Sequence, residues 1–182
     1  MTGVQTCALP IFLIFLLLGT ILTVIVQSSS ATVAITLIMC TQGWIPFEMA
    51  AAMVLGENIG TTITANIAAI SANVSARRAA IAHLMFNVFG VCWVMALFYP
   101  FTSMITWIVT NYGPGDPNEM TQFLSTLDPK TISLITSSAQ ITDPHLLALQ
   151  KQLLTLQVSV SYGLSLFHTV FNITNVDRKS VV

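Results

Sequence analysis

A run of small polar side chains interrupts an otherwise apolar stretch near the start of the chain, and this interruption constrains the fold more than any other feature. The run is VQSSSAT, residues 26–32, and it lies between Ile11–Ile25 and Val33–Cys40, which are almost wholly apolar. Backbone that stops being helical at membrane depth is tolerated only where it is buried in protein or lines a water-filled cavity. The pattern therefore predicts a broken helix that presents hydroxyl groups to a polar site.

A second interruption of the same kind follows. It is GENIGTT, residues 56–62, and it separates the apolar segments Phe47–Leu55 and Ile63–Ile70. Glycine adopts a positive φ at little cost, so we expect a short helix to end here and a new one, capped by Thr61 or Thr62, to begin. Two short, interrupted apolar segments in one chain are the usual sequence indication of a transporter binding site.

The two motifs together resemble the sodium/phosphate cotransporter family, in which QSSS and G-x-NIGTT signatures recur in each of two repeats. Here they are QSSSATVAIT, residues 27–36, and GENIGTTITA, residues 56–65, and the resemblance extends from about Phe12 to about Val176. It implies an all-α membrane protein whose broken or re-entrant transmembrane helices form one half of an inverted-repeat transporter. The sequence departs from the family's pattern at Glu57, where we would expect alanine.

Composition supports the membrane class independently of the motifs. Apolar residues make up 54% of the chain and charged residues 7%, with a mean hydropathy of +0.81, whereas about a quarter of the residues in a soluble domain are charged. Six basic residues and a net charge of −1 argue against a nucleic-acid partner. Cys7, Cys40 and Cys92 are scattered and odd in number, which fits buried thiols better than a disulfide framework or a metal site.

Several apolar segments are candidates to cross the membrane. Ala79–Tyr99 is predicted to be a spanning helix that ends at Pro100. Phe12–Val26 is too short to cross a core of about 30 Å at a rise of about 1.5 Å per residue. Either the chain upstream extends it, or it is one arm of a re-entrant hairpin that turns at residues 27–30. Phe101–Tyr112 is also short, which favours a position along the interface.

The positions of the charged residues predict how these segments are oriented in the membrane. Arg77 and Arg78 form the one basic pair before the C-terminal residues, and the positive-inside rule places them in the cytoplasm of a multi-pass plasma-membrane protein. The acidic connection that follows then lies outside, and Asp143-Pro144 opens a helix that leads into the last span. We interpret the chain as a non-native leader (1–10), a transmembrane repeat (11–112), an extramembrane loop (113–152), a final transmembrane helix (153–176) and a non-native tail (177–182).

An internal echo, H-x-x-F-N, occurs in both spans, as His83 with Asn87 and as His168 with Asn172. A spacing of four puts His and Asn on one helical face, one turn apart. Hydrogen bonds that hold the bundle together are the interpretation we favour, and such bonds inside a membrane contribute about 0.6–2 kcal/mol. Direct contact with a substrate is the alternative.

Anion and sodium capture is the chemistry that suits the two motifs. Helix N-termini offer free N–H groups and a partial positive charge to phosphate, and hydroxyl and amide oxygens suit sodium. A lone hydroxyl in a span more often bonds back to its own helix, which is the structural alternative. The predicted substrate- and ion-binding residues are Gln27, Ser28, Ser29, Ser30, Thr32, Glu57, Asn58, Gly60, Thr61 and Thr62, with Na⁺ at Gln27, Ser29, Asn58 and Thr61.

Glu57 is a functional candidate because it is an acid inside the membrane with no basic residue near it in the sequence. It either binds a cation, carries a proton, or points into a water-filled opening (an aqueous mouth), where it only changes the local electrostatic potential.

The sequence therefore predicts one half of a sodium-coupled phosphate carrier that needs its missing repeat or a second copy, and that uses no cofactor. A carrier of another small anion and a non-transporting subunit remain alternatives. An intramembrane serine protease is disfavoured because the chain lacks a G-x-S-x-G elbow.

Overall fold

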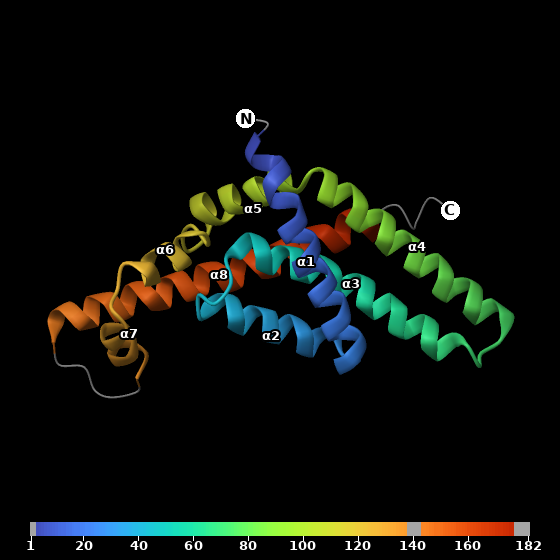
Figure 1. The fold of residues 1–182 in the computed structure, drawn as a ribbon, viewed down its shortest axis with the longest axis horizontal. Coiled ribbons are helices and arrows are strands. Elements are labelled where there is room, and N and C mark those ends of the chain that lie inside the picture. Colours follow the sequence, from blue (N-terminus) through green and yellow to red (C-terminus); the bar gives the residue numbers. More distant parts are fainter. Residues whose placement is uncertain (1–2, 138–142, 177–182) are drawn as a thin grey trace.

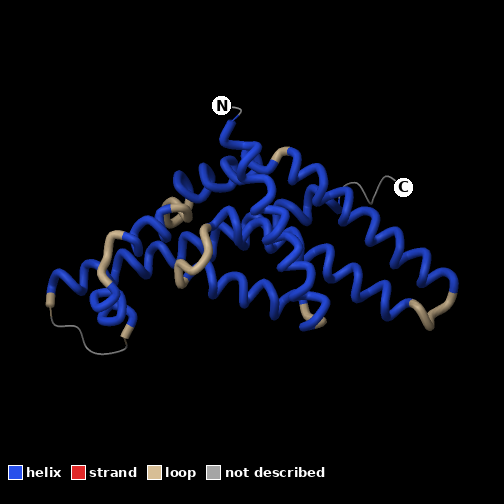
Figure 2. Tube along the Cα trace, in the orientation of Figure 1, coloured by secondary structure: helices blue, strands red, loops and turns tan. Residues whose placement is uncertain are grey.

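The computed structural model describes residues 3–137 and 143–176, and every regular element in these two ranges is a helix (Figure 2). Figure 1 shows α1 lying across α3, and α8 extending from the left edge of the view to the centre, where α1 and α3 cross. The predicted all-α class is confirmed. The helices are α1 Gly3–Val26, α2 Ser29–Thr41, α3 Phe47–Ala69, α4 Val74–Ala96, α5 Phe98–Tyr112, α6 Glu119–Ser125, α7 Pro129–Thr136 and α8 Pro144–Val176.

The predicted break at the first polar motif is present. α1 ends at Val26, Gln27 takes a left-handed conformation with φ of 56°, and α2 starts at Ser29. Ser28 is extended, and its hydroxyl accepts a hydrogen bond from the Ala31 amide at 3.4 Å, as an N-cap residue does. The small polar side chains therefore end one helix and begin the next within two residues.

The predicted break at the second motif is absent, and this expectation was wrong. α3 continues without interruption from Phe47 to Ala69, so Thr61 and Thr62 cap no helix, and neither Gly56 nor Gly60 has a positive φ. The separate short helix expected over Phe47–Leu55 is simply the first part of α3.

The glycines instead allow α1 to lie directly on α3. A methyl group at Gly56 would overlap the Leu16 carbonyl oxygen, and one at Gly60 would lie 2.6 Å from Thr23 Cβ. On the α1 side, a methyl group at Gly19 would overlap the Met53 carbonyl oxygen. Small residues four apart let two helix backbones approach closely, which drives helix association in membranes.

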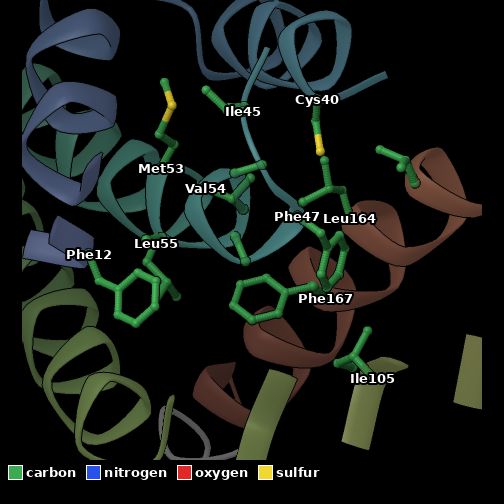
Figure 3. Close-up of a cluster of buried hydrophobic side chains, with 14 of the residues drawn as sticks. Phe12, Cys40, Ile45, Phe47, Met53, Val54, Leu55, Ile105, Leu164 and Phe167 are labelled. Atoms are coloured by element: carbon green, nitrogen blue, oxygen red, sulfur yellow. The ribbon is translucent and has the colours of Figure 1, made fainter. Parts of the chain in front are cut away.

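The core lies around the middle of α3, between α1, α5 and α8 (Figure 3). Leu55 is fully buried, as are the three alanines one turn before it. Phe12 of α1 packs on Phe98 of α5 with ring centroids 4.5 Å apart, and Phe101 of α5 meets Phe167 of α8 at 5.2 Å. Aromatic side chains thus join helices that are distant in the sequence.

The outer face of α1 is apolar and open, with about half of each side chain exposed at Leu13, Ile14, Leu17 and Ile21. A contiguous apolar face of this kind is unusual on a soluble monomer but natural against lipid. α4 and α8 are long and apolar enough to cross a membrane, over Val74–Ala96 and Pro144–Asn175, and shorter apolar helices cover 10–26 and 29–41.

Other boundaries differ in detail from those expected. Arg77 and Arg78 lie in the first turns of α4, not in the loop before it, and α4 ends at Ala96, so Pro100 falls in the first turn of α5. Of the described cysteines, Cys40 is buried as expected, whereas Cys92 is exposed on α4.

The connection over 113–152 is more ordered than a simple loop. It contains α6, α7 and the start of α8, and the predicted opening of α8 at Asp143-Pro144 is confirmed. Asp128 caps α7: hydrogen bonds from the Thr131 hydroxyl and backbone N–H lower the pKa of this carboxyl. The leader and tail residues 1–2 and 177–182 lie outside the described residues.

Candidate functional site

A cavity of about 200 Å³ lies between four helices and contains residues from both motifs and from the H-x-x-F-N echo. It is smaller than the roughly 300–1,000 Å³ of sites for drug-sized ligands, so its size suits a small ion. The lining residues are Ser29 and Val33 from α2, Glu57, Asn58, Thr61 and Thr62 from α3, His83 and Asn87 from α4, and His168 and Asn172 from α8.

The α2 end of the cavity is a helix N-terminus. The Ser28 side chain accepts from the Ala31 N–H, and the Ser28 carbonyl oxygen accepts from the Thr32 N–H at 3.1 Å. The N–H groups of Ser29 and Ser30 precede these and belong to the first turn, whose donors have no partner within the helix. Ser29 lines the cavity, so the positive end of the helix dipole lies at its wall.

The remaining residues of the first motif do not line the cavity. Gln27 and Ser30 are exposed at the corner between the helices, and Ser28 is occupied as the cap. Thr32 is buried, and its hydroxyl lies 3.2 Å from that of Thr23 on α1 and 2.9 Å from the Ser29 carbonyl oxygen. Thr32 therefore belongs to the packing contact between α1 and α2.

Glu57 is the most unusual residue of the cavity. Its side chain is 1% exposed, which argues against the alternative of an acid pointing into an aqueous mouth. The Thr36 hydroxyl of α2 donates a hydrogen bond of 2.6 Å to Oε1. Oε2 is buried and has no hydrogen-bond partner among the described residues. A buried carboxylate oxygen without a partner is costly and calls for an explanation.

The other α3 residues of the cavity use their hydrogens on their own helix. The Thr61 hydroxyl donates to the Glu57 carbonyl oxygen at 2.8 Å, and the Thr62 hydroxyl donates to the Ile59 carbonyl oxygen at 2.7 Å. The Asn58 amide nitrogen donates to the Val54 carbonyl oxygen at 2.8 Å. Back-bonding to the same helix, the structural alternative, is therefore present for all three side chains. They still line the cavity with their oxygens and, in the case of Asn58, with the second amide hydrogen.

Gly60, which was also predicted to bind ligand, does not line the cavity but packs against Thr20 and Thr23 of α1.

The His and Asn residues of the H-x-x-F-N echo take part both in the cavity wall and in hydrogen bonds of the helices. The two His and two Asn residues line the cavity, yet each Asn amide nitrogen also donates to its own His carbonyl oxygen, at 3.1 Å from Asn87 and 2.9 Å from Asn172. The bond between α4 and α8 comes from Asn175, whose amide donates to Asn87 Oδ1 at 3.1 Å. The echo thus contributes both to the bundle and to the cavity wall.

Sequence reasoning missed Val33, Thr36 and Asn175. A signal existed for Thr36, because Ser29, Thr32 and Thr36 follow the three- and four-residue spacing of one helical face. Asn175 lies three residues after Asn172 and could have been found in the same way.

The fold and cavity define a helical membrane protein with a small polar cavity between four of its helices. A family model described as Na+/Pi-cotransporter matches residues 12–109, more than half of the chain, and the chain belongs to this family. The predicted family resemblance is confirmed.

Individual relatives match shorter stretches. The chain is 40% identical to the uncharacterized protein YqeW of Bacillus subtilis over 108 residues, which are 59% of this chain and 34% of YqeW. It is 30% identical to the Salmonella typhimurium protein named "Putative inorganic phosphate export protein YjbB" over 89 residues, 49% of this chain and 16% of that protein. The protein of the same name in Escherichia coli is 35% identical over 74 residues, 41% of this chain and 14% of that protein. The match thus spans about a third or less of each relative, and no solved structure matches the chain.

Proposed function

We propose that this chain is part of a sodium-coupled carrier of inorganic phosphate, and that the cavity is its ion-binding site. The observation that carries the proposal is the meeting of both family motifs in one cavity, with Ser29 from α2 and Asn58, Thr61 and Thr62 from α3. These motifs are separated by more than a complete helix in the sequence. Their convergence on a small polar cavity is what a shared binding site requires.

Phosphate would bind at the α2 end of the cavity. The N–H group and the hydroxyl of Ser29 supply donors, and the helix dipole favours an anion there. His168 from α8 also lines the cavity and can donate through its ring. Among the described residues, no Lys or Arg lines the cavity, so helix and side-chain dipoles, together with a bound cation, have to offset the charge of the anion.

Sodium supplies that cation in this proposal. Three of the four residues predicted to hold Na⁺, namely Ser29, Asn58 and Thr61, line the cavity, whereas Gln27 is exposed at the corner after α1. Neutral oxygens of hydroxyl and amide groups are suitable ligands for a hard monovalent ion. No cofactor and no catalytic residue take part.

A complete carrier needs more than this chain, given how little of its relatives the chain spans. A second repeat or a second copy would close the cavity from the other side, and alternating access would arise as one repeat rocks against the other. We place the protein in the plasma membrane as a multi-pass protein, with the Arg77 end of α4 in the cytoplasm.

Two neighbouring serines provide the test. Ser29 lines the cavity and Ser30 is exposed, although both belong to the same motif. In the full transporter that contains this segment, Ser29→Ala should weaken phosphate affinity about ten- to hundredfold, because a hydrogen bond to a charged ligand contributes about 1.5–3 kcal/mol. Thr61→Ala, which removes a proposed Na⁺ ligand, should instead raise the sodium concentration that uptake requires. Ser30→Ala should have little effect.

The measurement is uptake of radioactive phosphate into vesicles at matched expression, with sodium chloride or choline chloride outside. Equal effects of both serine substitutions would contradict the proposed site, and uptake that does not depend on sodium would contradict the coupling. Stronger competition by sulfate than by phosphate would favour a carrier of another anion. Phosphate binding without any transport would favour a non-transporting subunit.

A further inference from the structure

We propose that Glu57 is the anchor of a site for one monovalent cation, Na⁺, on the α3 side of the cavity. The inference rests on the proposed function and deepens it, because it names the residue that carries the countercharge of the coupling ion. It goes beyond the family motif, because the G-x-NIGTT pattern leaves position 57 open.

The first observation is the state of the carboxyl group. Oε1 is held by the Thr36 hydroxyl at 2.6 Å, whereas Oε2 is buried without a partner among the described residues. Glu57 lines the cavity, so the space beside its side chain is the space in which a ligand can lie. A buried carboxylate with one bare oxygen attracts a cation or a proton, and it repels an anion.

The second observation is the orientation of the neighbouring polar groups. Asn58 and Thr61 donate their hydrogens to carbonyl oxygens of α3 itself, at 2.8 Å in both cases. Thr62 does the same at 2.7 Å. Thr61 and Thr62 can therefore offer the cavity only oxygen lone pairs, and Asn58 offers its Oδ1 together with one remaining amide hydrogen. Hard oxygen ligands of this kind suit an alkali cation and do not suit phosphate, which needs donors.

The third observation is the distance between the Glu57 carboxyl group and the N–H donors at the start of α2. Thr36 follows Ser29 by two turns of α2, which is roughly 10 Å along the helix axis. The carboxyl group that Thr36 holds is therefore set back from the helix N-terminus where phosphate finds its N–H groups. With Ser29 left to phosphate, cation and anion can occupy the cavity together without competing for the same atoms.

Charge balance selects a monovalent ion. Of the residues that the structure describes, Glu57 is the one carboxylate that lines the cavity, and the other titratable lining residues are His83 and His168. One positive charge neutralises the carboxylate, whereas a divalent ion would leave a net charge in a medium of low dielectric constant. A proton would also neutralise it, but a proton uses one oxygen and leaves the lone pairs of Asn58 and Thr61 without a partner.

The test compares two acids on the same helix. Glu48 also lies on α3 but lines a different pocket, with Thr102 and Ser103 of α5. In the full transporter, purified without phosphate, the thermal unfolding midpoint should rise with NaCl and not with choline chloride at equal ionic strength. Glu57→Gln keeps the size of the side chain and a hydrogen bond from Thr36, and it should weaken the apparent Na⁺ affinity at least about tenfold. Glu48→Gln should leave it unchanged.

A second variant keeps the test decisive if Glu57→Gln does not fold. Thr36→Val removes the group that orients the carboxyl but keeps the charge, so its Na⁺ affinity should fall less than that of Glu57→Gln. If Glu57→Gln is unstable, binding of radioactive sodium to Thr36→Val and to the unaltered protein decides the question. Equal Na⁺ responses of the unaltered protein and Glu57→Gln would overturn the proposal, as would stabilisation by acid but not by Na⁺. A Na⁺ response that persists in Ser29→Ala while phosphate binding does not improve with Na⁺ would refute the proposed function and leave the cation site standing.

Discussion

Substitution of Gly56 by alanine tests the central feature of the fold, which is the direct contact of α1 with α3. In the structure, a methyl group at this position would overlap the Leu16 carbonyl oxygen. A backbone oxygen cannot move aside as a flexible side chain can, so the two helices would have to separate. Strain of this kind costs typically about 1–3 kcal/mol.

Local helix propensity acts in the opposite direction. Replacing glycine by alanine inside a helix should stabilise it by about 0.5–1 kcal/mol if the helix stood alone. We therefore expect Gly56→Ala to destabilise the protein by about 1–2 kcal/mol in total. Gly60→Ala should be destabilising too, through its contact with Thr23 Cβ at 2.6 Å, and not through a positive φ.

The assay is reversible denaturant unfolding of the purified protein in detergent micelles. Ala68→Met is the control, because Ala68 is exposed on the same helix and methionine is a good helix former. This variant should unfold at the same denaturant concentration as the unaltered protein. A Gly56→Ala protein that is more stable than the original would show that propensity dominates, and it would refute the close packing of α1 on α3.

Two further predictions concern the bundle and its orientation. Asn175→Ala removes the bond to Asn87 Oδ1 and should lower the free energy of unfolding by about 0.6–1.7 kcal/mol. Asn172→Ala loses only a bond within its own helix, so it should leave stability unchanged and weaken phosphate binding. Equal losses of stability in the two variants would contradict these different roles. In a cysteine-free background, a cysteine at position 77 should react with a membrane-impermeant thiol reagent from the cytoplasmic side and one at position 128 from outside. Reaction of both from one side would exclude a single crossing by α4.

The first helix break could be predicted from the sequence because its chemistry is local. A serine that caps a helix and a residue that leaves the helical conformation are sufficient to turn the chain, and both lie within residues 26–32. The second motif gave the wrong prediction because glycine has two uses. It permits a positive φ, and it permits a close approach, and the choice between them depends on α1, a helix that lies about forty positions earlier in the chain.

The site was predictable in part for the same reason. The sequence identified residue types that suit ions, and Ser29, Glu57, Asn58, Thr61 and Thr62 do line one cavity. It could not tell that Gln27 and Ser30 point away, because their direction follows from the left-handed turn at Gln27. Nor could it tell that α4 and α8 bring their histidines to this cavity, since the periodicity gives the face of a helix but not what that face meets.

The proposed cation site also gives a physical origin for coupling between the two ions. Without a bound cation, the Glu57 carboxylate repels phosphate, and a charge roughly 10 Å away acts with about 1.7 kcal/mol at an effective dielectric constant of about 20. Bound Na⁺ cancels this repulsion, so sodium should tighten phosphate binding by about fifteen- to twentyfold for each phosphate charge, and phosphate should tighten sodium binding by the same factor. Glutamine at position 57 has no charge to cancel. Phosphate binding to the Glu57→Gln protein should therefore lose most of its dependence on sodium without losing its donors at the start of α2.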